Sequence, residues 1–442
     1  MKLTRTFLAA LCIASVTLVA AASARTAHRT GVPAQVALDW NANAVNAIRT
    51  AVTTVDGPAR PLYQTEGLIY LSYVQAAVYN ADVAIEGRYE PYGLSLFAPP
   101  GASPAAAVAA AAHDMLVYHF PAQKAALDAL YATSLAGIPD GQAKLDGISV
   151  GQAAALGTIA IRSNDGRNAP TATYGAPGAV VAGHWQVVPP ATAAQTPWVA
   201  FMHPFLLHSA SQFRPAPPPA LDSRTSKRDL AETQAYGAKT STAHTKLART
   251  SEQTDTAYFW NANVINQYSQ LFRDVATQHG MDLADTTRLL AMGTLVVTDA
   301  GIACFDAKYT YLFWRPATAI RSGADPDWLP LLNTPNHPEY PSAHGCVTSA
   351  LTQTIASALG TDHINVDIMG AQGGLTTLTA KRHFQTVGEI QSQIVDARPW
   401  IGFHFRNSTV TGLGVGNQVA HWALERYFLP TRDEHHHHHH GD

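Results

Sequence analysis

Charged side chains are scarce in this sequence. Lys, Arg, Asp and Glu together account for 14% of the 442 residues, whereas about a quarter is usual in soluble proteins. The net charge of −3 leaves no general basic surface, so the composition argues against nucleic acid as a partner. A chain this long with so few charges must enclose a large apolar interior, and we expect several helices buried on most sides. Any site for an anion would have to be built locally.

Cysteine is rare as well, and only two of the three cysteines would remain in a mature chain. Cys12 lies in the N-terminal stretch 1–24, which has a basic start, an apolar run over 7–22 and a small-residue ending. This pattern is typical of a cleaved secretory signal peptide. With Cys12 removed, a disulfide scaffold is excluded. Cys304 and Cys346 remain, either as one bridge or, in the interpretation we favour, as two buried free thiols.

Long apolar runs are also missing from the rest of the sequence. We find no later segment that we judge long and apolar enough to cross a bilayer, so no transmembrane segment is expected. Together with the signal pattern, this predicts a secreted or periplasmic protein. The histidines at 435–440 resemble a purification tag and are left out of the fold prediction.

Strand-like alternation of apolar and polar residues is nearly absent, while stretches of helical periodicity recur. The predicted helices cover residues 36–52, 63–82, 104–119, 122–135, 150–162, 227–236, 252–279, 283–314, 343–359, 379–396 and 411–428. The stretch 163–219 is rich in Gly and Pro, which indicates a long irregular connection. We therefore predict an all-α fold with two helical-bundle halves, 25–219 (which includes the connection) and 220–432.

The stretch AKYTYLFWRPATAI, residues 307–320, places two cations inside a predicted apolar helix. Lys308 and Arg315 are about two helical turns apart, so we expect both on one face, roughly 10 Å apart along the axis. Long side chains can converge from that separation on one small anion. Pro316 is expected to end or kink the helix where Arg315 emerges. Taken alone, the pair could also be two surface cations with their stems on apolar neighbours.

A second stretch, HPEYPSAHGCVTSA at 337–350, places Ser342 at the start of a predicted helix. Such a serine is often only an N-cap. A helix N-terminus, however, also presents free N–H groups and a partial positive charge to an anion. Ser342 and the amide of Ala343 could therefore hold an oxyanion, with His344 beside them as a general acid or base.

A third stretch, ARPWIGFHFRNS at 397–408, contributes Arg398 and, six residues later, His404. Pro399 is expected to break the helix that precedes it. By itself the stretch could hold a core histidine and an arginine paired with a carboxylate. Its meaning depends on the other two stretches.

Together, Lys-x6-Arg-Pro, Pro-Ser-x-His and Arg-x5-His resemble the three-part signature of the vanadium-dependent haloperoxidases and the type 2 phosphatidic acid phosphatase (PAP2) superfamily. The combination is specific, because six charged or catalytic residues of four types fall at fixed offsets within the three motifs. VALDWNANAVNAIRTA, IRSNDG and DAGIACFDAKYTYLFWRPATAIR resemble the bacterial and plant haloperoxidase-like branch. The resemblance covers nearly the whole mature chain and implies a PAP2/haloperoxidase-like helical fold.

The resemblance also implies a role for each motif residue at a bound vanadate or phosphate. The nonbridging oxygens would be held by Lys308, Arg315, Arg398, Ser342 and the amide of Ala343. His344 would be the acid/base group, and His404 would bind vanadium axially or attack phosphorus as a nucleophile. Elementary electrostatics agrees, because a multiply charged oxyanion taken from water needs about three fixed cations.

The implied function is that of a vanadate-dependent haloperoxidase. Vanadate acts as a Lewis acid toward hydrogen peroxide, and halide is oxidised to a hypohalous species that halogenates a small organic substrate. The alternative is a secreted acid phosphatase that binds phosphate in the same pocket and forms a phosphohistidine intermediate at His404. A third possibility is a non-catalytic helical protein that binds an oxyanion. Similarity along the whole chain to the haloperoxidase-like branch favours the first.

The choice of halide is indicated by His337, seven residues before His344. Family members that oxidise chloride resemble one another in carrying an aromatic residue there, whereas bromoperoxidases tend to carry His or Arg. The resemblance therefore favours bromide or iodide, although His337 could also be an ordinary loop histidine near the pocket mouth. A homodimer is expected by the same family analogy.

The chain departs from the family's pattern at three positions. Ala343 stands where Gly is usual, and Ala397 where the third motif usually begins with Ser. Ser408 stands where that motif usually ends with Asp, four residues after the histidine. The methyl group of Ala343 crowds the site, and the missing carboxylate at 408 removes a support of the third motif.

Overall fold

The computed structural model describes residues 32–55, 58–176, 178–189 and 191–431. The described residues belong to one compact unit that begins at Val32. The predicted signal peptide 1–24, with Cys12, and the histidines at 435–440 lie outside the described residues. The boundary between halves at 219 and 220 stays a prediction.

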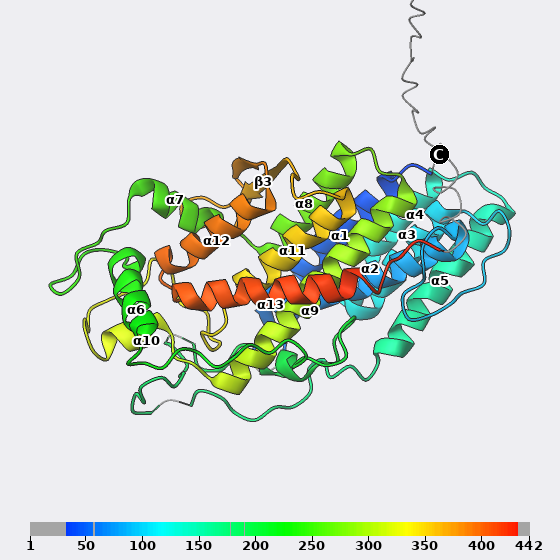
Figure 1. Cartoon of the computed structure of the whole chain (residues 1–442). Coiled ribbons are helices and arrows are strands. Elements are labelled where there is room, and N and C mark those ends of the chain that lie inside the picture. Colours follow the sequence, from blue (N-terminus) through cyan, green and yellow to red (C-terminus); the bar gives the residue numbers. More distant parts are fainter. Residues whose placement is uncertain (1–31, 56–57, 177, 190, 432–442) are drawn as a thin grey trace, which may run out of the picture. The chain divides into compact units, whose positions relative to one another are not determined.

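Helices dominate the described chain, which confirms the all-α prediction (Figure 1). The elements before the long connection are α1 (Gln35–Thr50), β1 (Val52–Thr53), β2 (Arg60–Pro61), α2 (Gln64–Glu86), α3 (Pro104–His119), the 3-10 helix η1 (Pro121–Gln123), α4 (Lys124–Ala136) and α5 (Gln142–Arg162). The elements that follow are the 3-10 helix η2 (Pro197–Phe201), α6 (Arg224–Gly237), α7 (Ser251–Phe259), α8 (Val264–Gln278), α9 (Leu283–Tyr311), α10 (Pro316–Arg321), α11 (Ala343–Leu359), β3 (Val366–Gly370), β4 (Ala380–Phe384), α12 (Val387–Trp400) and α13 (Arg406–Leu424). Apart from η2, the described residues between α5 and α6 are irregular, as the Gly and Pro content predicts.

Two of the predicted helices are wrong in part. The helix predicted at 379–396 begins as β4, which pairs antiparallel with β3, Ile368 standing opposite Arg382. Gly373 and Gly374 in the hairpin connection have positive φ, a conformation that glycine adopts without strain. The helix predicted at 252–279 is interrupted between α7 and α8. The interruption occurs because the Asn263 side chain accepts hydrogen bonds from two amides in the first turn of α8 and so caps a new helix.

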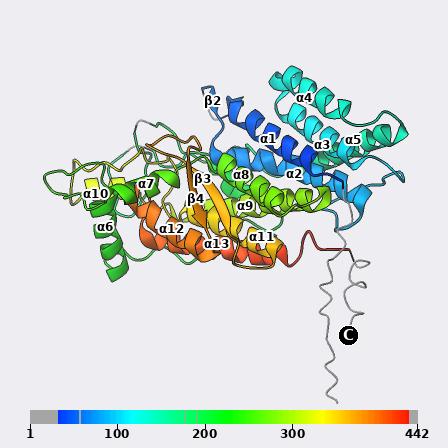
Figure 2. The same cartoon turned by 90° about the horizontal axis from the view of Figure 1, so that it is seen from above.

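The 29-residue helix α9 forms the centre of the fold. It contacts α1, α2, α8, α11 and α13, and Figure 2 shows it between α2 and α11. Contrary to the sequence prediction, α9 is long and apolar enough to cross a bilayer. Its most apolar window is nevertheless 100% buried by the surrounding described residues, so within this fold it is a core helix.

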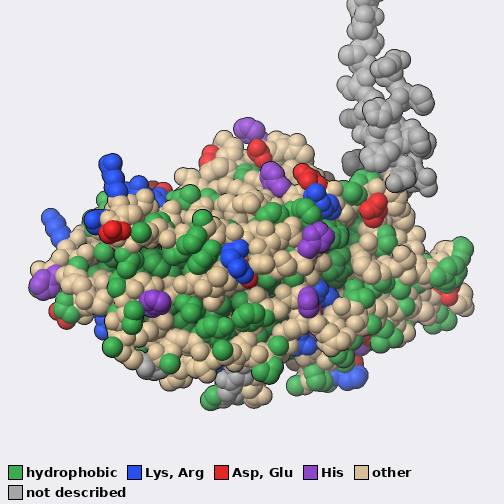
Figure 3. All heavy atoms as spheres, turned by 60° about the horizontal axis from the view of Figure 1, so that its bottom comes forward, with side chains coloured by type: hydrophobic (Ala, Val, Ile, Leu, Met, Phe, Trp, Pro, Cys, Tyr) green, Lys and Arg blue, Asp and Glu red, His purple; other side chains and the backbone are tan. Residues whose placement is uncertain are grey.

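The largest hydrophobic cluster of the described residues extends from Ala37 in α1 to Ala423 in α13 and beyond. On the face seen in Figure 3, charged side chains are scattered singly among apolar and neutral ones, in keeping with the low charge content. Few of the charged side chains therefore lie on this face. Several of the remainder lie inside.

Close packing of α11 against α13 brings two helix N-termini together. A Cβ atom on Gly412 would lie 2.6 Å from the carbonyl oxygen of Ser342, and one on Gly345 would lie 2.6 Å from that of Thr409. Glycine is therefore required at both positions for this approach. The amide of Ser342 donates to the carbonyl of Ser408 at 3.0 Å, which ties the start of α11 to the first turn of α13.

Candidate anion site

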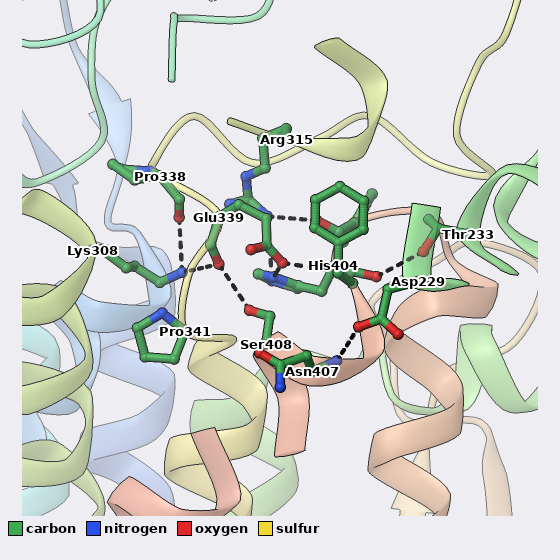
Figure 4. Close-up of polar contacts among 12 residues, drawn as sticks. Asp229, Thr233, Lys308, Arg315, Pro338, Glu339, Pro341, His404, Asn407 and Ser408 are labelled. Carbon is green, nitrogen blue, oxygen red and sulfur yellow. Dashed lines mark hydrogen bonds and ion pairs between the residues drawn. The ribbon is translucent and has the colours of Figure 1, made fainter. Parts of the chain in front are cut away.

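Three stretches that are far apart in the sequence meet beside the C-terminal end of α9. Lys308 lies in the last turn of α9, and Arg315 is the N-cap of α10. Ser342 precedes α11, Arg398 lies in the last turn of α12, and His404 lies between α12 and α13. Figure 4 shows Lys308, Arg315 and His404 converging on the loop before α11. Helix ends and their connections thus build the site.

The two cations of the first motif converge, but not from one helix face as predicted. α9 ends just before Leu312, which turns the chain with a φ of 47°. Pro316 does not end that helix but begins α10, because its fixed φ suits a first turn and its missing N–H is not needed there. Lys308 and Arg315 meet instead at the loop 337–339.

Both cations are fully buried and hold that loop by its backbone. Lys308 Nζ donates to the carbonyls of Pro338 at 2.8 Å and Glu339 at 2.9 Å. Arg315 Nε donates to the carbonyl of His337 at 2.8 Å. Burial lowers the pKa of Lys308 to about 8 and that of Arg315 to about 10. Neutral carbonyls therefore offset only part of the cost of burying these charges.

Arg398 supplies the third buried cation and is 1% exposed. Burial, followed by repulsion from Arg315, lowers its pKa to about 9. Its Nη1 donates to the carbonyl of Trp260 at 3.3 Å, whereas its Nε has no partner among the described residues. Pro399 does not break the helix as predicted: both residues lie inside α12. Pro399 has no N–H to donate to the preceding turn, and α12 ends one residue later, at Trp400.

The N-terminus of α11 faces the same place with free donors. Ser342 is the N-cap, but its side chain caps nothing, and within the described chain its buried Oγ has no partner. Ala343 and His344 open the helix, where the helix dipole adds partial positive charge. His344 Nε2 is also without a partner in the described residues. Burial, with Arg398 and Lys308 nearby, holds the pKa of His344 well below its ordinary value, so its ring is neutral.

His404 has a different neighbour on each ring nitrogen. Its Nδ1 lies 2.9 Å from Glu339 Oε1, and its Nε2 lies 3.2 Å from Arg315 Nη1. A guanidinium only donates, so Nε2 must accept, and Nδ1 carries the proton that Glu339 accepts. Burial, followed by repulsion from Arg315 and Lys308, keeps the pKa of His404 well below its ordinary value. A neutral imidazole with a bare Nε2 can act as a ligand or as a nucleophile.

Glu339 is the site residue that the sequence analysis missed. It is fully buried, and its Oε1 also accepts a hydrogen bond from the amide of Phe405 at 3.0 Å. Burial raises its pKa to about 7, although Lys308 and Arg315 oppose the shift. A lone acidic residue between two prolines in HPEYPS was a visible signal. Nothing in the sequence, however, shows that it faces a histidine 65 positions away.

His337 is a fixed part of the site wall. It is 7% exposed, and Arg315 Nη2 donates to its Nδ1 at 3.0 Å. Its ring packs against Phe305 with ring centroids 5.2 Å apart. Burial, followed by repulsion from Lys308 and Arg315, lowers its pKa well below the ordinary value, so this ring is neutral as well.

A cavity of about 290 Å³ lies beside these groups. The motif residues that line it are His337, Ala343, His344, Arg398 and His404. Leu62 and Tyr63 just before α2, three residues of α2 and Gln195 of the long connection line it too; the three in α2 are Gln64, Thr65 and Leu68. The cavity therefore joins the C-terminal motifs to the N-terminal part of the chain and gives small molecules room next to His404.

The three cations Lys308, Arg315 and Arg398 form what we call the cation cage. Among the described residues, the buried carboxylate that raises the pKa of Lys308 and Arg315 is Glu339. The neighbouring charge that lowers the pKa of Arg398 is Arg315. With Glu339 ionised, positive charge remains in excess. A desolvated charge without a counter-ion is costly, so the cage fits an anion that carries more than one negative charge.

Two thiols lie close behind the cage. Cys304 and Cys346 are buried and free, as favoured from the sequence. Cys304 Sγ lies 3.6 Å from the carbonyl oxygen of Pro341. The thiols thus pack beneath the start of α11 as small apolar groups.

Known proteins resemble both the motif-bearing half and the whole described chain. Residues 288–430, which contain every predicted site residue, match the family model of the VCPO second helical-bundle domain. The chain is 26% identical over 257 residues to a vanadium chloroperoxidase from Curvularia inaequalis. That alignment covers 43% of this chain and 42% of the relative, so the match spans less than half the length of either protein.

Two solved structures share the fold. The first bacterial vanadium-dependent iodoperoxidase superposes with a TM-score of 0.73 at 20% identity, over 89% of this chain and 97% of that one. A holo-type bacterial vanadium-dependent chloroperoxidase superposes with a TM-score of 0.67 at 19% identity, over 86% of this chain and 94% of that one. At these identities the likeness establishes the helical fold and leaves the chemistry to be argued from the site.

Proposed function

Residues 288–430 belong to the family of the second helical-bundle domain of the vanadium chloroperoxidases, and from this premise we propose that the protein is a vanadate-dependent haloperoxidase. It would use hydrogen peroxide to oxidise a halide to a hypohalous species that halogenates a small organic substrate. The observation that carries the proposal is the cation cage: Lys308, Arg315 and Arg398 are all buried, and Glu339 is a buried carboxylate near the first two of them. Such a site is suited to a compact anion with more than one charge.

The residues present fit vanadate. Ser342 Oγ and Arg398 Nε are buried donors without partners among the described residues, and both are positioned to bond oxyanion oxygens along with the amide of Ala343. His404 would ligate the metal through the unprotonated Nε2, which in the described chain accepts a hydrogen bond from Arg315. Bound vanadate would supply Lewis acidity toward hydrogen peroxide.

The chain's own residues would then perform four tasks. The cage and Ser342 bind the oxyanion and fix its orientation, because their donors are already held in place. His344, neutral and with an unpartnered Nε2 in the described chain, can take up or return a proton beside the anion. Burial of the cage excludes water from the charged oxygens. His404 would ligate the vanadium through Nε2.

For the halide we propose bromide or iodide. The support is His337, which lies in the cavity wall as a neutral imidazole held by Arg315. A chloride-oxidising family member would be expected to have an aromatic residue at this position, and the polar imidazole of His337 makes the wall less apolar. We further propose that the protein is exported to the periplasm or medium and forms a homodimer, on the signal pattern of 1–24 and on family analogy.

The deciding experiment loads the metal-free protein with orthovanadate and measures bromination of monochlorodimedone with hydrogen peroxide. We expect vanadate-dependent turnover with bromide and iodide, and loss of turnover in His404→Ala. Hydrolysis of p-nitrophenyl phosphate that vanadate merely inhibits, without bromination, would replace the proposal with the alternative.

That alternative, a PAP2-type acid phosphatase, is supported by the same bare Nε2 of His404, which could attack phosphorus and form a phosphohistidine. The two activities differ in what occupies the cage and not in the cage itself. Vanadate binding without either activity would identify a non-catalytic oxyanion binder.

A further inference from the structure

We propose that Glu339 is the positioning residue of this site: it fixes the tautomer of His404 and so keeps the lone pair of the ring on Nε2, where a metal could replace Arg315 as its partner. The inference rests on the proposed function only in that the oxyanion is taken to be vanadate. The tautomer itself is a property of the protein alone. The inference goes beyond the motifs, because Glu339 lies in the second stretch but is not one of its motif residues.

The contacts of His404 support one tautomer from both sides. The Nδ1–H donates to Glu339 Oε1 at 2.9 Å, and Arg315 Nη1 donates to Nε2 at 3.2 Å. Without Glu339, the Nδ1–H would be buried next to apolar neighbours and would lose its acceptor. The ring could then protonate Nε2 instead, which would remove the lone pair that a metal ligand needs.

Hydrogen bonds hold the carboxylate of Glu339 in one position. Its Oε1 accepts from the Phe405 amide, one residue beyond His404, so the carboxylate grips both the ring and the backbone of the same turn. Its Oε2 has no partner among the described residues. Glu339 does not line the 290 Å³ cavity but a separate apolar cavity of about 70 Å³, with Phe313, Tyr340 and Phe405. The carboxylate therefore lies behind the imidazole, away from the bound anion.

Ser408 explains why the carboxylate can come from Glu339. Ser408 lies in the first turn of α13, four residues after His404, and lines the same apolar cavity. Its Oγ is 3.4 Å from the carbonyl oxygen of Glu339. An aspartate at 408 would put a second buried carboxylate beside the first, and like charges in such a place repel strongly. The two positions are thus alternatives for one carboxylate, and this chain uses 339.

Three variants test the effect of Glu339 on the tautomer of His404. In Glu339→Gln the amide oxygen can still accept from Nδ1–H, so the tautomer should persist while the charge is lost. In Glu339→Ala the acceptor is lost. In Glu339→Ala combined with Ser408→Asp, a carboxylate returns from the neighbouring position.

The first measurement is the tautomer, read from the imidazole ¹⁵N shifts of the full-length metal-free protein, with the His404 signals identified by their loss in His404→Gln. We expect a protonated Nδ1 and a bare Nε2 in the unchanged protein and in Glu339→Gln. We expect protonated Nε2 to become populated in Glu339→Ala and to recede in the double variant. A bare Nδ1 in the unchanged protein would overturn the proposal without any variant.

The second measurement is orthovanadate affinity by calorimetry, compared with inorganic phosphate. Loss of a histidine's supporting hydrogen bond typically weakens metal binding about 10- to 100-fold, and we expect Glu339→Ala to fall in that range. Glu339→Gln should lose less than about 10-fold, and the double variant should recover to within about 10-fold of the unchanged protein. Ser408→Asp alone should weaken binding.

The outcomes separate this inference from the proposed function. Equal vanadate affinity and an unchanged tautomer in folded Glu339→Ala would overturn the inference, even if the protein is a haloperoxidase. Absence of bromination in the unchanged protein would overturn the proposed function, while the tautomer results would still decide the role of Glu339.

Discussion

At the scale of single residues, unpartnered buried donors and acceptors stand out at the anion site. Ser342 Oγ, His344 Nε2 and Arg398 Nε all lack partners within the described chain. A buried polar atom left in this state costs about 1–3 kcal/mol, and a bound ion is one of the explanations for such an atom. The unliganded site is therefore less stable than a comparable apolar core would be.

Removing the hydroxyl of Ser342 should stabilise the unliganded protein and weaken anion binding. We expect Ser342→Ala to raise the free energy of unfolding by about 1 kcal/mol, because a buried group without a partner disappears. A hydrogen bond to a charged oxygen is worth about 1.5–3 kcal/mol, so orthovanadate or phosphate should bind roughly 10- to 100-fold more weakly. Urea unfolding and calorimetric titration measure the two effects.

Ser349 offers a matched control in the same helix. It is also buried, but its Oγ donates to the carbonyls of Gly345 at 2.9 Å and Cys346 at 3.1 Å. Ser349→Ala should leave anion affinity unchanged and should not stabilise the protein. If Ser342→Ala behaved like Ser349→Ala in both measurements, Ser342 would be an ordinary core serine.

Most residues of the candidate site could be predicted from the sequence, because they occur in motifs with a fixed spacing. Lys308 with Arg315, and Arg398 with His404, lie close in the chain and converge in the structure. Glu339 could not be identified in this way. Its partner His404 is 65 positions away, and which histidine a buried carboxylate faces depends on how α11 and α13 pack.

At the scale of elements, helix bounds were predictable where a cap and the apolar period agree. The predicted helix 104–119 has the bounds of α3, since the Ser103 side chain accepts from the amide of Ala106 and Pro104 occupies the first turn. Prolines within apolar stretches were less informative. Pro316 begins a helix, because its ring is compatible with the first turn, whereas Pro399 lies in the last turn of one.

The β3–β4 hairpin escaped prediction for a different reason. Each strand has five residues, too few for a two-residue period to be told from a helical one. β3 also packs against α8, a contact that the local sequence does not contain. Short strands on a helical protein are thus recognised only after the tertiary fold is known.

The contact between α2 and α9 makes stability depend on pH through Asp82. This side chain is fully buried, and its Oδ2 accepts from Thr287 Oγ1 at 2.7 Å. Burial raises its pKa from 3.8 to about 7. Between these values the folded protein keeps a proton that the unfolded chain has released, so the contribution of Asp82 is fully present below about pH 4 and is lost as pH rises through about 7.

Asp82→Asn should remove this pH dependence. The amide oxygen can still accept from Thr287, and no charge has to be buried at high pH. We expect the variant to gain up to about 4 kcal/mol over the unchanged protein at pH 8 and little at pH 4. Urea unfolding across pH 4–8 measures the difference, and Asp39→Asn, on the exposed side of α1, is the control. Parallel curves for Asp82→Asn and the unchanged protein would contradict the linkage.

At the scale of the whole molecule, a chain with few charges buries several of them in one place. The largest hydrophobic cluster joins α1 to α13 across both predicted halves. One continuous core therefore offsets the desolvation free energy of the cation cage. That core tolerates the cage because hydrophobic burial over such a length far exceeds the desolvation of three cations. An anion that neutralises the cage should therefore stabilise the entire described fold and not a local loop.

Orthovanadate or phosphate is accordingly expected to raise the melting temperature of the whole protein, with stabilisation reaching about 2.7 kcal/mol at 100 times the dissociation constant. Chloride at matched ionic strength should give little, since a single charge leaves the cage partly unmatched. Arg398→Met should abolish the response and should itself melt no lower than the unliganded protein, because an incompletely paired buried cation is gone. Arg273→Met is the control: Arg273 is a partly buried arginine of α8, bonded to Asn41, and its loss should leave the response to vanadate intact. An equal rise with chloride, or an undiminished rise in Arg398→Met, would mean that the cage is not the anion site and that the excess of buried positive charge is balanced in another way.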